Sequence, residues 1–434
     1  MVTEDQPMNE ANGVVHLSAK PNESSAPADI MSVGAIVIGG DHPGLAVVRS
    51  LGRRGIPVIV IEDKRCISSW SRYATRVVLV EDILDERKTV DAVLHIGSLF
   101  NLRGWVLIPT RDETVAAFSR YRDELTSFFR VTTGEWDSIQ WAWDKKKTYE
   151  LASKLDIPCP QTFNVSAVEE LPSLYRHLPL AIKPAIKEHF FYATGAKAWR
   201  ANTAAELHLL YEKASAQIAP EEILLQEIIP GDGSEQYSYC AYARNGQPHS
   251  KLTARRIRQH PREFGRAATY VETVDVPEIE ELSQRFLQAI SYHGLIEIEF
   301  KRDYRDGKFK LLDVNARAWG FHGIGAACGI DFPYLLYAEQ FGKSMDPASA
   351  RPGIGWLRLI TDVPTAISDF AHGSMSMSEY IRSLRATRVE SVFDWHDPLP
   401  SIAEMILVPF MIKKKYPTVP SSPRIMASTN SPIN

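Results

Sequence analysis

One stretch of the chain alternates apolar and charged residues with a period of two. Residues 295–301 read Leu-Ile-Glu-Ile-Glu-Phe-Lys, and after a short turn residues 308–315 read Lys-Phe-Lys-Leu-Leu-Asp-Val-Asn. Two such segments joined by residues that include a glycine predict a β-hairpin. This hairpin constrains the fold more than any other feature, because a shift of one residue in its register would move every side chain to the opposite face.

The turn of the hairpin sets that register. We expect a three-residue loop that ends at Gly307 in the left-handed conformation and pairs Tyr304 with Lys308. Counting back from this pair places Glu299 opposite Asp313. A two-residue loop would instead put these two carboxylates on opposite faces of the hairpin.

The same count places Glu297 opposite Asn315, so four oxygen-bearing side chains share one face. Directly opposed carboxylates repel each other and lower stability unless a cation relieves them. Hard oxygen ligands suit Mg²⁺ or Mn²⁺, and Mg²⁺ usually keeps waters and takes phosphate oxygens as further ligands. These residues favour a metal and nucleotide site over the alternative of a solvent-facing amphipathic hairpin, and Arg317 just beyond would add a fixed cation.

The first part of the chain alternates between strand and helix patterns. An apolar strand, Ala35–Ile38, leads into the turn Gly39–Gly44, a helical pattern follows, and a second apolar strand spans Ile56–Ile61. Two strands bridged by a helix form a βαβ unit, and the pattern recurs up to about residue 130. We therefore predict a doubly wound α/β unit at the N-terminus.

This unit also suggests an alternative, a dinucleotide-dependent oxidoreductase. Glu62 follows the second strand, where a dinucleotide-binding protein holds a ribose. However, Asp41 stands where the fingerprint needs its second glycine, and no Lys-Ser or Lys-Thr pair follows Gly44 as a Walker loop requires. The turn is then either structural or faces a substrate.

Composition excludes several other classes of protein. With 434 residues, 24% charged residues and a net charge of −4, the chain suits several packed soluble units and lacks a nucleic-acid footprint. Its four cysteines lie far apart, as expected for a reducing cytoplasm. The late apolar run Met405–Ile412 is too short to span a bilayer, and we expect a core helix ended by Lys413–Lys415.

Two motifs carry a resemblance to a known family. Residues 294–300, Gly-Leu-Ile-Glu-Ile-Glu-Phe, and residues 312–317, Leu-Asp-Val-Asn-Ala-Arg, resemble the metal-binding signature of the ATP-grasp superfamily. The likeness is closer to the carboxylate–amine ligases that resemble the carbamoyl-phosphate synthetase large chain, such as the D-aspartate ligase group.

That resemblance assigns roles to four residues. It implies that Glu299 and Asp313 bridge two metal ions and that Asn315 completes the ligand set. It also implies that Arg317 contacts the transferred phosphate or the acyl intermediate. The chain departs from the family pattern at Asp313, where glutamate is usual, and at Ala316, where proline is usual.

Other segments resemble the family in the expected order. Lys145 precedes the segment Ile-Pro-Cys-Pro-Gln-Thr and resembles the first lysine that contacts the ATP phosphates, and Lys183 in Leu-Ala-Ile-Lys-Pro resembles the second. Cations that a strand delivers into a cleft stabilise gathered phosphate charge. Residues 185–195 take the place of the family's glycine-rich lid but are aromatic and nearly glycine-free, and Lys197 follows them.

The segment 223–231, Ile-Leu-Leu-Gln-Glu-Ile-Ile-Pro-Gly, resembles the hinge that holds adenine between the two halves of the fold. Gln226 and the backbone near Glu227 and Ile229 would pair with the edge of the base, while apolar neighbours enclose the ring. Glu235, shortly after the hinge, is the candidate for binding the ribose hydroxyls.

A basic run, Lys251–Pro261, lies between the hinge and the hairpin. In a chain of net negative charge, a run of this length is weak evidence for nucleic acid. Arginine instead supplies the bidentate geometry that a carboxylate or an acyl phosphate requires. Arg256 and Arg258 share a face if the run is a strand, so we predict that both bind the substrate, in a place where related ligases carry a similar segment.

The resemblance implies a multidomain chain of α/β and α+β classes. We expect a disordered tail at 1–30, a Rossmann-like pre-ATP-grasp domain at 31–135, ATP-grasp subdomains at 136–224 (with the lid) and 225–345 (with the metal site), and a C-terminal region at 346–434. The expected function is ATP-dependent amide formation through an acyl phosphate, with ATP and two Mg²⁺ or Mn²⁺ ions. We expect an amino-acid-like carboxylate and amine as partners, no nucleic acid, no stable membrane insertion, and a homodimer as one option.

Two further hypotheses stand beside the ligase. One is an NAD(P)-dependent oxidoreductase that uses the N-terminal βαβ unit, and the other is an ATP-binding regulatory protein that has lost catalysis. The ligase needs no Ser-His-Asp or Cys-His arrangement, because metal ions and Lys145, Lys183 and Arg317 would neutralise the phosphoryl charge. Closure of the lid would exclude water from the acyl phosphate.

Overall fold

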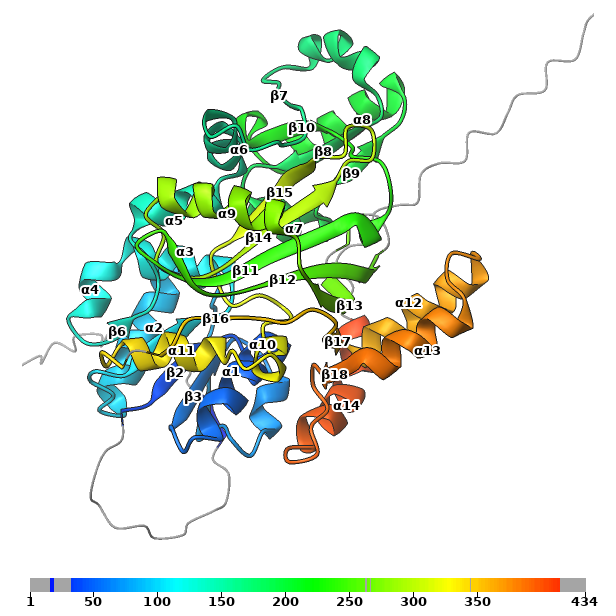
Figure 1. Cartoon of the computed structure of the whole chain (residues 1–434). Helices are drawn as coiled ribbons and strands as arrows, with labels where there is room; N and C mark the ends of the chain where they lie inside the picture. Colours follow the sequence, from blue (N-terminus) through cyan, green and yellow to red (C-terminus); the bar gives the residue numbers. More distant parts are fainter. Residues whose placement is uncertain (1–15, 19–32, 262–263, 266, 344, 414–434) are drawn as a thin grey trace, which may run out of the picture.

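The structure is a computed structural model that describes residues 16–18, 33–261, 264–265, 267–343 and 345–413. It contains three β-sheets with helices packed around them, and Figure 1 shows the N-terminal sheet and the small sheet on either side of a large central one. The tail expected at residues 1–30 lies outside the described residues except for His16–Ser18, which forms a short strand.

The N-terminal sheet has the strand order β1-β4-β3-β2-β5-β6 and is parallel except for β1. All residues of β2 and β3 are buried, as expected for parallel strands covered on both faces. The predicted βαβ unit is therefore present as β2-α1-β3. The elements are β1 His16–Ser18, β2 Ala35–Ile38, α1 His42–Gly52, β3 Val58–Glu62, η1 Ile67–Trp70, β4 Arg76–Leu79, α2 Glu86–Leu99, β5 Val106–Pro109, α3 Asp112–Arg120, α4 Arg122–Thr126 and β6 Arg130–Val131.

The small sheet follows in the chain and has the order β7-β10-β8-β9, with every neighbouring pair antiparallel. It carries the segments predicted to contain the second ATP lysine and the hinge, on β8 and β10. The elements are α5 Trp136–Trp143, α6 Lys145–Lys154, β7 Thr162–Asn164, η2 Val168–His177, β8 Leu180–Pro184, α7 Lys187–Thr194, β9 Trp199–Ala201, α8 Ala204–Ser215, η3 Pro220–Glu222 and β10 Ile223–Glu227.

The large sheet has the order β15-β14-β11-β12-β13-β17-β18, with β16 beside β12. Its last strands come from the predicted C-terminal region, which therefore extends the sheet that carries the hairpin. The elements are η4 Gly233–Glu235, β11 Gln236–Arg244, β12 Gln247–His260, β13 Ala267–Val274, α9 Pro277–Ala289, β14 Gly294–Arg302, β15 Phe309–Asn315, α10 Ile324–Ala327, α11 Phe332–Glu339, β16 Ala348–Ser349, β17 Gly355–Leu357, α12 Leu359–Ala371, α13 Met377–Ala386, β18 Thr387–Glu390 and α14 Leu399–Lys413.

A continuous apolar core joins the N-terminal sheet to the large sheet. Val37 of β2 and Val48 of α1 belong to the same buried cluster as Cys240 of β11 and Trp319, and Trp319 is fully buried. Burial of so many apolar side chains between two layers holds them rigidly together. The end of β2 is thereby placed beside the end of β15.

The hairpin β14–β15 brings together the carboxylates that the sequence predicts. Glu299 lies opposite Asp313, and Glu297 lies opposite Asn315. Because residues two apart on a strand point to the same side, all four side chains share one face. The predicted pairing of the acidic residues is therefore present.

The turn of the hairpin differs from the prediction. Asp303 donates its N–H to the carbonyl of Lys308 at 2.8 Å, so the loop has four residues and the predicted pair of Tyr304 with Lys308 is wrong. Gly307 does take the left-handed conformation, with φ of +74°. A bulge at Leu312 adds one residue to β15 and compensates for the longer loop.

Two buried ion pairs attach the C-terminal helices to the rest of the molecule. Arg258 of β12 donates to both carboxylate oxygens of Asp362 in α12, at 2.8 and 2.9 Å. Arg49 of α1 donates to Asp397, which precedes α14, at 3.0 Å. Both pairs are almost completely inaccessible to solvent.

No helix in the described ranges is both long and apolar enough to cross a bilayer. Met405–Ile412 was predicted to belong to a core helix. In the part of this run whose side chains are described, the prediction is wrong, because Met405 and Ile406 of α14 are exposed. The inward face of α14 instead includes Glu404, which pairs with Arg358 at 2.6 Å. A charged side chain with a buried partner thus sets the orientation of this helix.

The ion pair between Arg258 and Asp362 gives a stability prediction. Asp362→Ala leaves a buried guanidinium without its counter-charge, which costs about 3–5 kcal/mol. We expect α12 and α13 to become susceptible to limited proteolysis at a lower temperature than in the parent chain. Asp91→Ala, which removes an exposed partner of Arg87, is the matched control and should change nothing measurable. Equal protease resistance of both variants would contradict the assigned role of the pair.

Candidate active site

The face of the large sheet that carries Glu299 and Asp313 is the centre of the site. Arg256 of β12 donates to Glu299 at 3.0 Å, and Lys145 at the start of α6 binds the carboxylate of Asp313. Burial alone would raise the pKa of Glu299, but Arg256 and Lys197 outweigh it and hold that pKa below its usual range. Both carboxylates are thus ionised and compensated by cations from other elements.

Glu297 and Asn315 support this pair from the next position along each strand. Asn315 donates its amide to Glu297 at 3.2 Å and to Glu299 at 3.1 Å, and Ser238 donates to Glu297 at 2.9 Å. Burial and the adjacent charge of Glu299 raise the pKa of Glu297 to about 7. Glu297 can therefore carry a proton near neutrality, which relieves repulsion within the cluster.

The donor atoms suit a divalent cation that also binds phosphate. Among the residues that the structure describes, no group of three or more His, Cys, Asp or Glu is placed to hold a metal ion. Mg²⁺ commonly takes one or two protein carboxylates and completes its shell with waters and phosphate oxygens. Glu299, Asp313 and the amide oxygen of Asn315 would supply such a partial set, so the residues fit a metal bound together with a nucleotide.

Two lysines, Lys145 next to the small sheet and Lys183 within it, lie near the face that carries Glu299 and Asp313. Lys183 of β8 donates to the hydroxyl of Tyr149 at 2.5 Å, and that hydroxyl donates to the carbonyl of Leu312 at 2.7 Å. Burial, reinforced by the positive charge of Lys145, lowers the pKa of Lys183 to about 7. Lys145 and Lys183 are therefore close enough to act on one anionic group, as predicted for ATP phosphates.

Lys197 also lies at the carboxylate face. Its ammonium donates to the carbonyl of Gly265 at 3.3 Å. Burial lowers its pKa to about 8, while the charge of Glu299 opposes that shift. Residues 185–195, the predicted lid, contain helix α7, which ends at Gly195 in the left-handed conformation. The lid position is thus occupied by a helix rather than by a flexible glycine loop.

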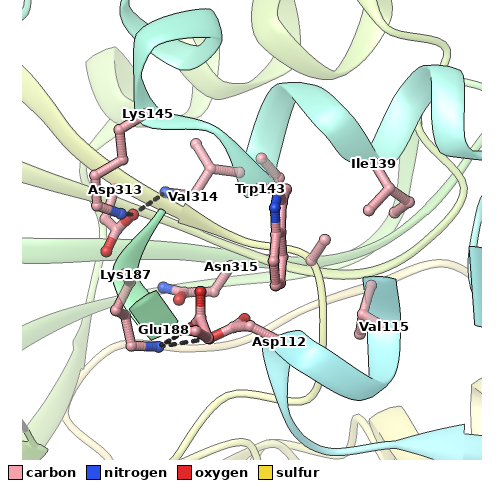
Figure 2. A pocket seen from close by; sticks show the side chains of 12 residues that line it. Asp112, Val115, Ile139, Trp143, Lys145, Lys187, Glu188, Asp313, Val314 and Asn315 are labelled. Carbon is pink, nitrogen blue, oxygen red and sulfur yellow. Dashed lines mark hydrogen bonds and ion pairs between the residues drawn. The ribbon is translucent and has the colours of Figure 1, made fainter. Parts of the chain in front are cut away.

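A charge network joins the N-terminal unit, α7 and the segment after β15. Asp112, the first residue of α3, accepts from Arg317 at 2.8 and 3.2 Å and from Lys187 at 2.5 Å. Figure 2 shows the ammonium of Lys187 pointing toward the carboxylates of Asp112 and Glu188, and Lys145 beside Asp313. Burial would raise the pKa of Asp112, but Arg317 and Lys187 hold it far below its usual range. The carboxylate of Asp112 thus orients two cations at the site.

The predicted hinge begins with β10, an inner strand of the small sheet, and continues beyond it. Gln226 is buried in β10 and donates to the hydroxyl of Thr162 at 2.7 Å, while the carboxylate of Glu227 pairs with Arg305 of the hairpin. The carbonyl of Ile229 accepts from Lys301 of β14 at 3.0 Å. The hinge is therefore tied to β14 and its turn by charged side chains.

The ribose candidate, Glu235 in η4, forms an ion pair with Arg255 at 3.2 Å and remains partly exposed. Its position follows the hinge, as the prediction requires. The carboxylates of Glu227 and Glu235 both have protein partners. Each would therefore exchange or share its partner when a ligand binds.

The two predicted substrate arginines are separated. Arg256 lines the cavity beside Glu299, whereas Arg258 pairs with Asp362 in α12 and donates to Ser383 of α13 at 3.0 Å. Register irregularities around Arg258 interrupt the regular alternation of β12. The prediction that both arginines share one face and bind substrate is therefore wrong for Arg258, which anchors the C-terminal helices.

A cavity of about 300 Å³ lies next to the carboxylate face. Asp41 and His42, in the turn that follows β2, line it together with Arg317, Phe321 and Trp356. Burial and the nearby Arg358 hold the pKa of His42 well below its usual range. The glycine-containing turn thus faces the cavity, which was one of the two roles left open by the sequence.

Glu62 is not placed to hold a ribose. It is fully buried, accepts the N–H of Gly40 at 2.8 Å and binds the guanidinium of Arg111 at 3.0 and 3.1 Å. A dinucleotide would have to break this pair to reach the carboxylate, and breaking a buried pair is costly. The structure therefore provides no support for the dinucleotide hypothesis.

Several site residues were not selected from the sequence, namely His42, Asp112, Tyr149 and Lys187. A usable signal existed for Asp112, because it follows β5 at the carboxyl edge of a parallel sheet, where ligands bind in such folds. Lys187 and Tyr149 lie on helices and had no local motif. Their roles depend on contacts between layers, which the spacing of residues along the chain does not fix.

Comparison with known proteins agrees with this geometry. Residues 221–358, which include Arg256, Glu299 and Asp313, match the family described as ATP-grasp in the biosynthetic pathway with Ter operon. D-aspartate ligase of Enterococcus faecium (strain Aus0004) is 25% identical over 226 residues, which cover 49% of this chain and 53% of that protein. The chain thus matches about half the length of this curated relative.

Solved structures share the fold at low sequence identity. The biotin carboxylase domain dimer of Hydrogenobacter thermophilus 2-oxoglutarate carboxylase, in complex with MgADP, ADP and bicarbonate, has a TM-score of 0.59 and 15% identity, covering 74% of this chain and 73% of that one. L-amino acid ligase from Bacillus licheniformis has a TM-score of 0.56 and 15% identity, covering 74% and 78%. These structures show that the chain shares their fold, and the sheet that carries Glu299 and Asp313 lies within the segment that matches the ATP-grasp family.

Proposed function

We propose that the protein is an ATP-dependent ligase that joins a carboxylate to an amine through an acyl phosphate. The observation that carries this proposal is the convergence of opposed carboxylates, Glu299 and Asp313, with Lys145 of α6 and Lys183 of β8. Such an arrangement can hold a nucleotide's phosphates with two Mg²⁺ or Mn²⁺ ions. The relatives named D-aspartate ligase and L-amino acid ligase support the same reaction class.

In the first step, an oxygen of the substrate carboxylate forms a bond to the γ-phosphorus of ATP. The bond from that phosphorus to the bridging oxygen breaks, and ADP leaves with the electron pair. Lys145 and Lys183 would bind the phosphate oxygens and offset their charge. Divalent ions at Glu299 and Asp313 would supply Lewis acid stabilisation. Arg256 and Arg317 are placed to orient the carboxylate.

In the second step, the lone pair of the amine forms a bond to the acyl carbon, and phosphate leaves with the electrons of the carbon–oxygen bond. The amine must lose a proton. His42 faces the cavity, and burial with the nearby Arg358 holds its pKa well below its usual range, so its neutral ring can accept a hydrogen bond from the amine and orient it. Helix α7 and the side chains of Phe191 and Tyr192, which line the same cavity, would limit the access of water.

The substrates that fit the cavity are small and zwitterionic. Acidic side chains of Asp41 and Glu113 line it together with the cations Arg256 and Arg317. A molecule that carries both an ammonium and a carboxylate complements such a mixture. We therefore propose amino-acid-like substrates in the reducing cytoplasm, where the four free cysteines are stable, and a homodimer as the assembly to test first.

Glu299→Gln tests the metal-binding role directly. The substitution preserves the shape of the side chain but removes a charged ligand, so we expect at least a hundredfold lower ATP-dependent phosphate release with amino acids present. The measurement screens pairs of amino acids with Mg²⁺ and ATP and traps the acyl phosphate with hydroxylamine. Asp306→Asn, at the exposed tip of the same hairpin, is the control and should retain full activity.

The alternatives give different results in the same screen. A change in NAD(P)H absorbance would favour an oxidoreductase, and ATP binding without phosphate release or hydroxamate in any pair would favour a regulatory protein. Full turnover by Glu299→Gln, with an unchanged thermal transition, would rule out the metal assignment.

The pH dependence of ATP binding tests Lys183. Because burial and Lys145 lower its pKa to about 7, the side chain of the free protein loses its proton as the pH rises above that value. Phosphate binds the protonated form, so the Kd for ATP should rise by up to about tenfold per pH unit above 7. Lys183→Arg keeps its charge and should flatten the profile, leaving a weaker dependence from Lys197, whose pKa is about 8. Identical profiles in both proteins, measured by calorimetry, would refute this assignment.

A further inference from the structure

Helix α12 is amphipathic in the inverse sense. Its exposed residues are all apolar, namely Leu359, Val363, Pro364, Ile367 and Ala371. Its acids face inward, with Asp362 fully buried against Arg258 and Asp369 nearly so. A surface helix normally turns its polar face to solvent. The outer face of α12 is therefore shaped for an apolar environment.

Helix α14 repeats this inversion. Its exposed side chains, in the part where side chains are described, are Leu399, Ile402, Met405 and Ile406. The charged residue in that stretch, Glu404, faces inward and binds Arg358, the residue that precedes α12. The same ion pair places the beginning of α12 beside α14. Two neighbouring helices thus direct charge inward and apolar side chains outward.

Exposed apolar side chains are concentrated in this region. Of the nineteen large apolar side chains that are exposed in the described ranges, twelve lie between Leu359 and Ile406. Figure 1 shows α12, α13 and α14 gathered at one edge of the molecule, away from the small sheet. A concentration of exposed apolar side chains in one region marks an interaction site in a soluble protein. We define it as the C-terminal apolar surface, made of the exposed residues of α12, α13 and α14.

Aromatic and basic side chains accompany this surface. Trp395 is 84% exposed and its ring lies edge-on to that of Phe393, between β18 and α14. Arg385 of α13 and Arg388 of β18 are exposed, whereas Glu379 and Arg382 of α13 line a cavity shared with Arg258 of β12 and Asp369 of α12. In the sequence, Lys413, Lys414 and Lys415 end and follow α14. Exposed tryptophan beside apolar helices and excess positive charge are the features of a protein that binds a lipid interface.

We propose that the C-terminal apolar surface docks the protein on the surface of a membrane that contains anionic lipid. The outward side chains of α12 and α14 enter the boundary between headgroups and acyl chains, with the helices lying along the membrane plane. Trp395 sits at the level of the headgroups, and the arginines of α13 and β18 bind lipid phosphates. This inference does not depend on the reaction that the enzyme catalyses.

Charge favours lipid over a second copy of the chain as the occupant. In a twofold symmetric contact the same patch forms both sides of the interface. Arg385 and Arg388 from each copy would then meet at the contact, and their like charge would oppose association. Anionic headgroups neutralise the same arginines while the acyl chains cover the apolar side chains. The lipid surface thus satisfies both chemical features of the patch.

Vesicle co-sedimentation of the full chain tests the proposal. The probes are vesicles of phosphatidylcholine alone and of phosphatidylcholine mixed with phosphatidylglycerol. We expect binding to the mixed vesicles that weakens as NaCl is added. The double variant Ile367→Glu, Ile402→Glu should reduce the bound fraction by at least about tenfold. The matched control is Leu209→Glu in α8, because Leu209 is 59% exposed and Ile367 is 61% exposed; it should bind as the parent does.

Two results would overturn the proposal. One is equal vesicle binding by the parent chain and the double variant. The other is a parent chain that binds neither kind of vesicle and sediments as a dimer, while the double variant sediments as a monomer. That result would assign the surface to contact with a second copy. An unchanged thermal transition and unchanged ATP binding in the double variant would show that its fold is intact.

Discussion

The opposition of Glu299 and Asp313 across β14 and β15 is the constraint on which the candidate site depends. Two buried carboxylates at neighbouring positions repel each other unless positive charge compensates them. The compensating groups come from another strand of the same sheet, Arg256 on β12, and from a helix next to the small sheet, Lys145 on α6. The site is therefore assembled only when the small sheet packs against the large one, and a bound metal and nucleotide would replace part of this compensation rather than create it.

The N-terminal unit completes the site through a second compensated carboxylate. Asp112 binds Arg317 and Lys187, so the segment after β15 and the helical lid are held by the same acid. Opening of helix α7 away from the N-terminal unit would therefore break the ion pair between Lys187 and Asp112. The cavity lined by His42 and Trp356 is then bounded by residues of several packed elements, which would limit the access of water to the proposed acyl phosphate.

The sequence predicted the strands and the pairing of Glu299 with Asp313, because period-two alternation is a local property of the chain. It did not predict the length of the turn or the bulge at Leu312. These two features shift the register in opposite directions, so Glu299 still lies opposite Asp313. Arg258 was misassigned because irregular pairing in β12 breaks the alternation that the prediction assumed. Asp112 and Lys187 were not found because their partners lie on other layers of the fold.

The site and the C-terminal apolar surface share one strand. Arg256 binds Glu299 in the site, and two residues later Arg258 binds Asp362 at the base of α12. The pairing of Arg258 turns the polar side of α12 inward, and this leaves only apolar residues for its outer face. The ion pair that holds Arg258 away from the cavity beside Glu299 thus also fixes which face of α12 is buried. Arg256 and Arg258 bind Glu299 and Asp362 respectively, so this segment of β12 contacts both regions. A displacement of α12 would therefore act on the strand that positions Arg256.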